Sequence, residues 1–357
     1  MNNRLKKLRD QLRERGLDGA IITGRPNTLY LSGFTGSTSY FLVGLDKAWL
    51  VVDFRYTIQA KKQAFDGIEV IEHGESFYST LNELIADHKL ESIGFEGQNL
   101  TFSEYERFKS KLPSAKSFVS LEDAVNRLRV FKDADEFEKI QQAVLLGDKV
   151  FDHILKFIKP GMKEIEVAAE MEYTMRKLGA KGPSFETIVA SGPRSAMCHG
   201  TASDHVIQNG DAIVLDFGTI YQNYCSDMTR TIFIGEPSDE LKKIYGIVRK
   251  AQEAALDCLV SGISGFDTDK VARDIIAEAG YGNHFGHGLG HGVGLVIHED
   301  PRLSLKSEDT LLDGMVFTVE PGIYVEGLGG VRIEDMGVLV DGKFRNFTTS
   351  PKDMIIL

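Results

Sequence analysis

The sequence has few cysteines, and this scarcity bears on where the protein works. Only three of its 357 residues are cysteine, and Cys198, Cys225 and Cys258 stand far apart with no Cys-X-X-Cys pair among them. An odd, widely spaced set of this kind does not form the disulfide framework of a small secreted domain. We therefore expect a reduced, cytoplasmic protein.

Membrane-directing segments and excess positive charge are also lacking. No apolar run approaches the roughly 18 residues that span a bilayer, and the N-terminal MNNRLKKLRDQLRERG is charged from its start, unlike a secretory signal. The 41 Lys and Arg residues are outnumbered by 52 Asp and Glu, for a formal net charge of −11. Because phosphate groups are bound by basic patches, we expect neither nucleic acid nor membrane as a partner.

The first 130 residues have the pattern of an α/β domain. An amphipathic helix is predicted over residues 4–16, where Leu5, Leu8 and Leu12 share one stripe. Short apolar strands are predicted at DGAIITG, YFLVG, AWLVVD, IEVIE and SIGFEG, and helices at about 56–65, 78–88 and 102–111. This alternation is typical of α/β folds. The sequence pattern changes near residues 128–132, and this change predicts domains at 1–130 and 131–357.

The second domain contains two similar strand segments. GDAIVLDFG (210–218) and GMVFTVEPG (314–322) each open with Gly, run apolar and carry an acid six residues after that Gly. Strand pairs alternate here with helices predicted at about 134–158, 163–178, 238–260 and 267–279. The similarity indicates an internal duplication, with two related halves facing each other.

Four acids interrupt apolar, β-branched runs of this domain. They are Asp216, Asp227 in CSDMTRT, Glu320 and Glu334 in VRIEDM. Strand interiors are depleted in such residues. Symmetric hairpins would place Asp216 opposite Asp227 and Glu320 opposite Glu334, where like charges destabilise the pairing. Buried carboxylates placed in this way either share a proton or bind a cation.

The number of acids separates these two interpretations. A proton-sharing pair needs only two carboxylates, whereas four balance the charge of two divalent cations, and metals about 3.5–4 Å apart form a known catalytic arrangement. A single imidazole would complete the shell. Oxygen-rich ligation favours Mn²⁺, with Co²⁺, Zn²⁺ or Fe²⁺ as alternatives. The competing interpretation is that the acids lie on half-exposed strands at the surface.

Histidine and glycine are concentrated in FGHGLGHGVGLVIHED, residues 285–300. Its five glycines disfavour a helix. An extended backbone places His287 and His291 on one face, whereas His298 has the opposite parity. Glycines beside reactive side chains often mark the close approach of a ligand or another backbone. The alternative is a flexible loop with solvent-exposed histidines.

These segments resemble a known family. DFGTIYQNYCSDMTRT, HGLGHGVGLVIHED, TVEPGIY and VRIEDM are similar to the proline-specific metallopeptidases of pita-bread fold, aminopeptidase P and prolidase, over most of residues 130–357. YLSGFTGS and DFRYTIQAKKQ resemble the N-terminal domain of these enzymes, which methionine aminopeptidases lack. The resemblance implies a creatinase-like α/β domain at 1–130 and an α+β pita-bread catalytic domain at 131–357 with an internal pseudo-twofold duplication.

The resemblance also implies roles for individual residues. The implied metal ligands are Asp216, Asp227, His291, Glu320 and Glu334. Glu320 is also the implied proton carrier, and the implied catalytic histidines are His199 and His298. His287 and Arg332 are expected on the proline side of the substrate.

The expected reaction is metal-dependent hydrolysis of the Xaa–Pro bond at the N-terminus of proline-containing peptides. The FTGS string after YLSG favours an Xaa-Pro aminopeptidase. The main alternative is an Xaa-Pro dipeptidase, that is, a prolidase restricted to dipeptides. A creatinase-like enzyme without metal and a non-catalytic peptide-binding scaffold are disfavoured by the complete ligand set. Short proline-containing peptides are the expected substrates, and the resemblance implies a homodimer.

Overall fold

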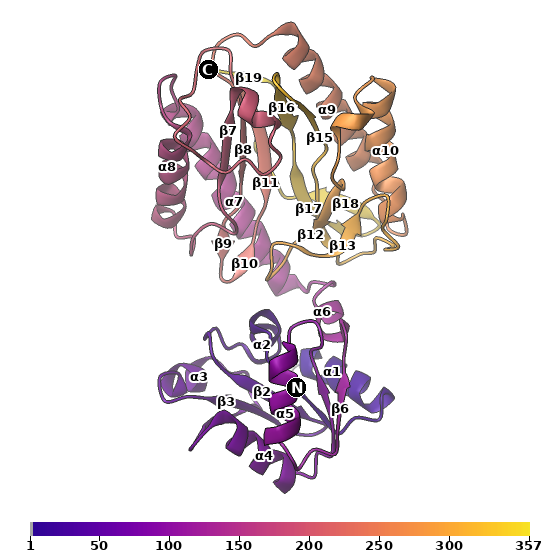
Figure 1. The fold of residues 1–357 in the computed structure, drawn as a ribbon. Helices are drawn as coiled ribbons and strands as arrows, with labels where there is room; N and C mark the ends of the chain where they lie inside the picture. The colour runs from indigo at the N-terminus through magenta and orange to yellow at the C-terminus, as the bar shows by residue number, and fades with distance from the viewer. Residues whose placement is uncertain (1–2) are drawn as a thin grey trace. The chain divides into compact units, whose positions relative to one another are not determined.

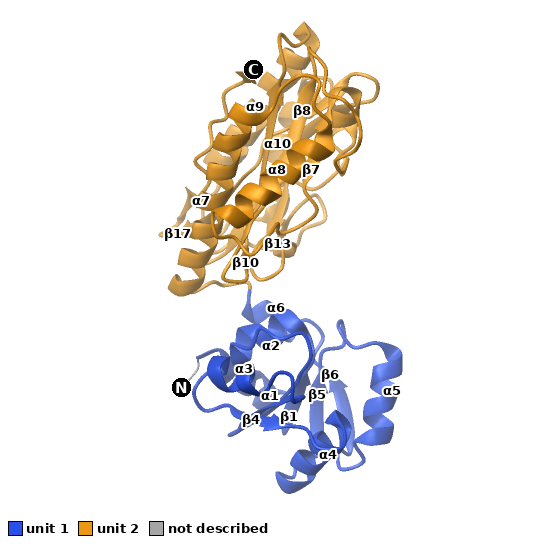
Figure 2. Cartoon of the chain, turned by 90° about the vertical axis from the view of Figure 1, so that its left-hand side faces the viewer, with its two compact units in different colours: residues 1–129 blue, residues 130–357 orange. Residues whose placement is uncertain are grey.

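The computed structural model of the protein describes residues 3–357. The chain divides into two compact units, residues 1–129 and residues 130–357 (Figure 2). Each unit has its own sheets and its own hydrophobic core. Within residues 3–357, no helix combines the length and the apolar character that crossing a bilayer requires.

Unit 1 is built on a six-stranded sheet in the order β4-β3-β2-β1-β5-β6. Its strands are β1 (Gly19–Ile22), β2 (Tyr40–Gly44), β3 (Ala48–Val52), β4 (Glu69–Glu72), β5 (Ser92–Phe95) and β6 (Ser117–Ser120). Its helices are α1 (Asn3–Glu14), α2 (Arg25–Ser32), α3 (Thr57–Gln63), α4 (Phe77–Asp87), α5 (Phe102–Lys111) and α6 (Ala124–Leu128). The central strands β1, β2 and β3 pair antiparallel, and the outer strands join in parallel.

The α/β character expected for the N-terminal part is confirmed, and every strand and helix predicted there is present. Three elements, α2, α6 and β6, were not predicted. Helix α2 is only eight residues long, begins with a proline in its first turn and ends at Gly33 with a φ of 82°. A segment so short and so rich in turn-forming residues gives little helical periodicity in sequence.

Unit 2 holds the remaining elements. Its helices are α7 (Ala134–Phe157), α8 (Glu164–Lys177), α9 (Asp239–Cys258) and α10 (Gly265–Glu278), with short 3₁₀ segments η1 (Gly192–Ala196) and η2 (Gly282–His284). Its strands before α9 are β7 (Ile188–Ser191), β8 (Ala212–Phe217), β9 (Ile220–Tyr221), β10 (Tyr224–Cys225) and β11 (Met228–Phe233). Those after α10 are β12 (Gly290–Gly292), β13 (Glu299–Leu303), β14 (Val316–Val319), β15 (Gly322–Val325), β16 (Gly329–Arg332), β17 (Asp335–Val340), β18 (Lys343–Asn346) and β19 (Ile355–Ile356).

Unit 2 consists of two similar halves. One sheet has the order β19-β11-β8-β7 and the other β13-β12-β14-β17-β18, and each contains an antiparallel pair, β8 with β11 and β14 with β17. In Figure 1 these sheets lie between α8 on one side and α10 on the other. One core packs residues of α7 and α8 against β8, and a second packs residues of α9 and α10 against β14. The predicted pita-bread architecture with an internal duplication is therefore confirmed.

The predicted pairing of Asp216 with Asp227 is wrong by two residues. Strand β8 places Asp216 opposite Thr229 of β11. The cause is the turn between them, where Gln222 and Asn223 adopt positive φ values of 46° and 73° and close a tight hairpin. A shift of two residues preserves side-chain parity, so Asp216 and Asp227 still project from the same face of the sheet.

The second predicted pairing is confirmed. Val319 of β14 lies opposite Asp335 of β17, and Gly322 of β15 lies opposite Arg332 of β16. Glu320 and Glu334 stand between these two paired segments, and both segments have the register that places the two glutamates across from each other. The ladder is interrupted at this level of the sheet, where two carboxylates meet.

The extended backbone considered for the glycine-rich segment is present only in part: residues 290–292 form β12, whereas residues 294–298 bend before β13 begins. A β-carbon on Gly290 would lie 2.0 Å from the carbonyl oxygen of Thr318, and one on Gly292 would lie 2.1 Å from that of Asp300. Neighbouring strands therefore leave no room for a side chain at either position. Of the two causes considered for these glycines, the close approach of another backbone explains Gly290 and Gly292.

Candidate metal centre

A cavity of about 520 Å³ opens within unit 2 and is lined from both halves. The acids on its wall are Asp216, Asp227, Glu320 and Glu334, together with Glu186. The basic and imidazole side chains are His199, His287, His291, His298, Arg302 and Arg332. All nine residues singled out from the sequence thus line one cavity, although they are spread over more than 130 positions of the chain.

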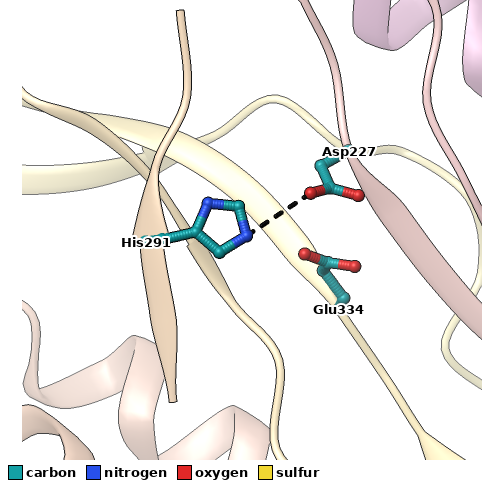
Figure 3. Close-up of side chains that lie close together, drawn as sticks. All are labelled: Asp227, His291 and Glu334. Atoms are coloured by element: carbon teal, nitrogen blue, oxygen red, sulfur yellow. Dashed lines mark ion pairs between the residues drawn. The ribbon is translucent and has the colours of Figure 1, made fainter. Parts of the chain in front are cut away.

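Three of the side chains that line this cavity form a tight group. Ligand atoms of Asp227, His291 and Glu334 all lie within 4.8 Å of one another, and the three residues are buried. Nε2 of His291 is 3.6 Å from Oδ2 of Asp227 (Figure 3). Asp227 lies between β10 and β11, Glu334 lies between β16 and β17, and His291 belongs to β12. Both carboxylates face the imidazole (Figure 3).

The imidazole of His291 is oriented to act as a ligand. Its Nδ1 lies 3.1 Å from the carbonyl oxygen of Gly292. Because that oxygen can only accept, Nδ1 carries the proton and the lone pair of the neutral ring is on Nε2, which faces the acids. Burial lowers the pKa of His291 to about 3, which keeps the ring neutral at physiological pH.

Asp216 and Glu320 lie at the edge of the tight group. Oε1 of Glu320 is 3.4 Å from Nε2 of His291. Oδ2 of Asp216 accepts a hydrogen bond of 2.6 Å from Arg332, while its Oδ1 is buried and, within residues 3–357, has no hydrogen-bond partner. Oε1 of Glu334 is likewise buried without a partner in the described chain.

Unpaired buried carboxylate oxygens are costly unless a cation neutralises them. Here two such oxygens, a neutral imidazole and two further carboxylates face one cavity, and this set matches the oxygen and nitrogen ligands that divalent metals take. The residues therefore fit a metal centre.

Electrostatics support this interpretation. Burial raises the pKa of Asp227 well above its usual range, and the neighbouring Glu334 raises it further. The pKa of Glu334 is raised in the same way, by burial and then by Glu320. Burial raises the pKa of Glu320 to about 8. In the absence of a cation Glu320 would hold a proton near neutral pH. For all three acids, a bound cation would favour the ionised carboxylate and so compete with protons.

Arg332 connects the acids to the substrate-facing wall. Its Nε donates to Oγ1 of Thr229 at 3.0 Å, and that hydroxyl donates to Oε2 of Glu334 at 2.8 Å. Its Nη1 donates to the hydroxyl of Tyr324 at 2.8 Å and to the carbonyl of Cys198 at 3.2 Å. One buried guanidinium thus orients two of the candidate ligands.

The three remaining histidines occupy different positions on the wall. His287 is half-buried, and its Nε2 lies 2.9 Å from the hydroxyl of Tyr324. The ring of His298 lies 4.4 Å from that of His291, in an edge-to-face arrangement, and its side chain reaches the open part of the cavity. His199 is exposed to the cavity from the loop that follows η1.

Sequence reasoning missed Tyr324, Thr229 and Arg302. Tyr324 joins His287 to Arg332, Thr229 joins Arg332 to Glu334, and Arg302 lines the cavity near His298. In the sequence Tyr324 and Thr229 are ordinary strand residues, and only the register shows which face they occupy. Arg302 follows His298 by four residues, and its parity on β13 could have indicated it.

Comparison with known proteins identifies the family. Residues 138–341 match metallopeptidase family M24, and residues 4–131 match the creatinase/prolidase N-terminal domain. The chain belongs to metallopeptidase family M24. Both matches agree with the resemblance drawn from the sequence motifs.

Individual members of the family are similar over almost the whole chain. A structure described as Xaa-Pro dipeptidase from Bacillus anthracis has a TM-score of 0.97 and 43% identity, covering 99% of both chains. An X-Pro aminopeptidase structure from Thermotoga maritima has a TM-score of 0.91 and 44% identity, covering 96% of this chain and 99% of that one. The Xaa-Pro dipeptidase of Pyrococcus horikoshii is 39% identical over 356 residues, 99% of each protein. This M24 protein is therefore an enzyme of the metallopeptidase class.

Proposed function

We propose that this metallopeptidase hydrolyses the Xaa–Pro bond of dipeptides, as an Xaa-Pro dipeptidase. The observation that carries the peptidase activity is the convergence of two buried acids, two partly buried acids and the neutral His291 on one cavity. The dipeptidase names of the relatives from B. anthracis and P. horikoshii support this choice over the aminopeptidase that the FTGS string favoured.

We propose that two divalent cations are held by Asp216, Asp227, His291, Glu320 and Glu334, with Mn²⁺ as the first candidate for oxygen-rich ligation. Bound cations of this kind polarise a carbonyl oxygen and lower the pKa of water. Co²⁺, Zn²⁺ and Fe²⁺ remain the alternatives for the same ligands.

The chain's own residues have distinct proposed tasks. Glu320, whose Oε1 lies 3.4 Å from Nε2 of His291, is the proposed proton carrier, which would take a proton from water and pass it to the leaving nitrogen. His199 and His298 face the open cavity and are placed to donate to the oxygen on which charge develops. His287 and Arg332, joined through Tyr324, form the proposed wall on the proline side.

A dipeptide ends in a carboxylate directly after proline, and we propose Arg302 as its partner. The Arg302 side chain lines the cavity, is 48% exposed, and faces Asp300 only at 4.0 Å. A guanidinium that is not engaged in a close ion pair can bind a carboxylate with two parallel hydrogen bonds. A longer peptide would have an uncharged amide at that point and would lose this interaction.

The second candidate is an Xaa-Pro aminopeptidase, because the T. maritima structure of that name is as similar in sequence as the dipeptidase. The two are separated by kcat/KM for an Xaa–Pro dipeptide and for the same peptide extended by one residue, both with Mn²⁺ supplied. The dipeptidase predicts a strong preference for the dipeptide, and equal or better cleavage of the tripeptide would establish the aminopeptidase.

The role of Arg302 has its own test. Arg302→Ala is expected to raise KM for the dipeptide, whereas Lys306→Ala removes the same charge from an exposed residue that is not among the cavity-lining residues of the described chain. Equal KM values for the two variants would remove Arg302 from the site.

We also propose that the enzyme is a cytoplasmic homodimer acting on short proline-containing peptides, with residues 1–130 and 131–357 as its two domains. The odd number and wide spacing of its three cysteines support a cytoplasmic location. Light scattering coupled to size-exclusion chromatography tests the dimer, and a monomeric mass would overturn it.

A further inference from the structure

The loop that carries His199, residues 192–203, has little regular secondary structure, namely η1 and one β-bridge between Thr201 and Ile188. This loop begins directly after Ser191, the last residue of β7, and Cys198, His199 and Thr201 line the cavity. Loops with few backbone hydrogen bonds open easily unless side chains hold them. The position of the His199 imidazole therefore depends on whatever holds this loop.

Both ends of the loop are bound by one buried carboxylate, that of Glu164. Glu164 is the first residue of α8, and its exposed fraction is 0%. Its Oε1 accepts from the backbone N–H and the hydroxyl of Ser191, at 2.7 and 2.9 Å. Its Oε2 accepts from the backbone N–H and the hydroxyl of Ser203, at 3.1 and 2.7 Å.

Arg194 extends this contact into the loop. Its Nε donates to Oε2 of Glu164 at 3.0 Å, and its Nη2 donates to the carbonyl of Thr201 at 2.8 Å. On the other side, Arg332 donates to the carbonyl of Cys198. The loop is thus held from α8 on one side and from the metal-centre arginine on the other, with His199 between the two attachments.

The other half of unit 2 contains a similar arrangement of a buried helix acid and an arginine. Asp269 of α10 is fully buried, accepts from the backbone N–H of Leu289 at 2.9 Å, and forms an ion pair with Arg273. Arg273 in turn donates to the carbonyl of His287 at 2.7 Å. In each half, an acid on the second helix and an arginine together hold the backbone beside a cavity-lining histidine.

We infer that Glu164, acting with Arg194, is a positioning residue that places His199 for the reaction, an inference that rests on the role proposed for His199. Glu164 itself is not among the residues that line the cavity in the described chain. The two carboxylate oxygens of Glu164 accept hydrogen bonds from two backbone N–H groups, two hydroxyls and one guanidinium. An amide in place of the carboxylate would point its NH₂ group at one of these sets of donors, and one end of the loop would lose its attachment.

The experiment is a double-mutant cycle on Xaa–Pro hydrolysis. Glu164→Gln is expected to lower kcat/KM by about 10- to 100-fold, as displaced catalytic groups do, with the metal content unchanged. In the His199→Ala background the same substitution is expected to lower kcat/KM by less than twofold, because the group it positions is already absent. An equal loss in both backgrounds would overturn the inference.

Asp148→Asn is the matched control. Asp148 is also a buried helix carboxylate, and it accepts from the backbone N–H and hydroxyl groups of Thr349 and Ser350, which are not cavity-lining residues of the described chain. Its substitution is expected to cost stability, to leave kcat/KM within about twofold, and to combine additively with His199→Ala. A loss as large as that of Glu164→Gln would show that any buried carboxylate has this effect, and would overturn the inference.

Hydrogen exchange in the metal-free protein gives a readout independent of activity. Backbone amides of residues 192–203 are expected to exchange faster in Glu164→Gln and in Arg194→Ala, but not in Asp148→Asn. Arg194 is partly exposed, so its variant tests whether these side chains hold the loop even where Glu164→Gln fails to fold. Unchanged exchange would overturn the inference that Glu164 and Arg194 hold the loop. Faster exchange together with a fully active His199→Ala would overturn only the proposed role of His199.

Discussion

Nη2 of Arg332 donates a 2.6 Å hydrogen bond to Oδ2 of Asp216, and this contact joins the second half of the catalytic unit to the first. The Arg332 side chain is 3% exposed and that of Asp216 13%. Burial raises the pKa of Asp216, and Arg332 opposes this by favouring the ionised carboxylate. Arg332 therefore favours the ionised form of Asp216, whose Oδ1 has no hydrogen-bond partner within residues 3–357.

The first prediction concerns this pair. Arg332→Gln should weaken Mn²⁺ affinity about 10- to 100-fold, as substitutions of groups that orient metal ligands do, because the pKa of Asp216 rises further once the guanidinium is absent. Isothermal titration calorimetry at pH 7 measures the affinity. Arg302→Ala serves as the control, since it removes a cavity arginine without an ion pair to Asp216. Equal Mn²⁺ affinities in Arg332→Gln and in the wild type would contradict the prediction.

The second prediction concerns Glu334, one of the proposed metal ligands. Glu334→Gln replaces a carboxylate by an amide of the same shape, and it should remove at least one bound Mn²⁺. Substitution of a group that only orients a metal ligand lowers activity roughly 10- to 100-fold, and the loss of kcat/KM in Glu334→Gln should be larger than that. Metal content is measured by atomic absorption and turnover on an Xaa–Pro peptide with Mn²⁺ supplied. Glu253→Gln alters a surface acid and should change neither. Wild-type turnover in Glu334→Gln or in Asp227→Ala would exclude the dinuclear centre.

The third prediction concerns pH. Glu320 has a pKa of about 8 in the folded protein against an ordinary value of 4.5. Its folded form holds a proton that the unfolded chain has lost, so its contribution to stability is present at low pH and disappears as pH rises through 8. The metal-free protein should therefore become less stable between pH 7 and 8.5, a window above the titration of buried histidines whose pKa values are lowered.

Thermal unfolding of the metal-free protein across this window measures the effect. Added Mn²⁺ should stabilise the protein more strongly at pH 8.5 than at pH 7, because fewer protons compete for the carboxylates. Stability of the metal-free protein that rises with pH over this range would be the opposite of what the raised carboxylate pKa requires.

The fourth prediction concerns the glycines of the histidine-rich segment. Gly290→Ala would place a β-carbon 2.0 Å from the carbonyl oxygen of Thr318, and β12 would have to move away from β14 together with His291. We expect a loss of about 1–3 kcal/mol in the free energy of unfolding and weaker metal binding. Gly286→Ala, where nothing lies within 4 Å, should stay within about 0.5 kcal/mol of the wild type. Urea denaturation of both variants decides the point, and equal stabilities would refute the packing argument.

The sequence predicts most of this architecture because its signals are local. The leucine stripe of residues 4–16, the short apolar runs and the acids inside strands can all be read within a few positions. The register of β14–β17 was also predictable, since a nearly symmetric hairpin leaves few alternatives. The register of β8–β11 was not, because a tight turn at Gln222 and Asn223 displaces the pairing by two residues.

Features that depend on distant contacts could not be read from the sequence. The carboxylate of Glu164 accepts hydrogen bonds from Ser191 and Ser203, which lie 27 and 39 positions away, and three of its five donors are backbone N–H groups or a guanidinium nitrogen, which no sequence motif marks. Tyr324 likewise resembles any aromatic residue of a strand until the fold brings its hydroxyl between His287 and Arg332. Such contacts are determined by packing between elements and not by local sequence pattern.

The internal duplication divides the proposed ligands unequally, since Asp216 and Asp227 precede α9 and the other three follow α10. A polypeptide ending in the short connection between β11 and α9 would therefore carry two carboxylates and no imidazole from the set. The complementary fragment would carry the rest. Separately expressed fragments should each bind Mn²⁺ poorly, and mixing them should restore binding, so that the metal would report on the assembly of the two halves.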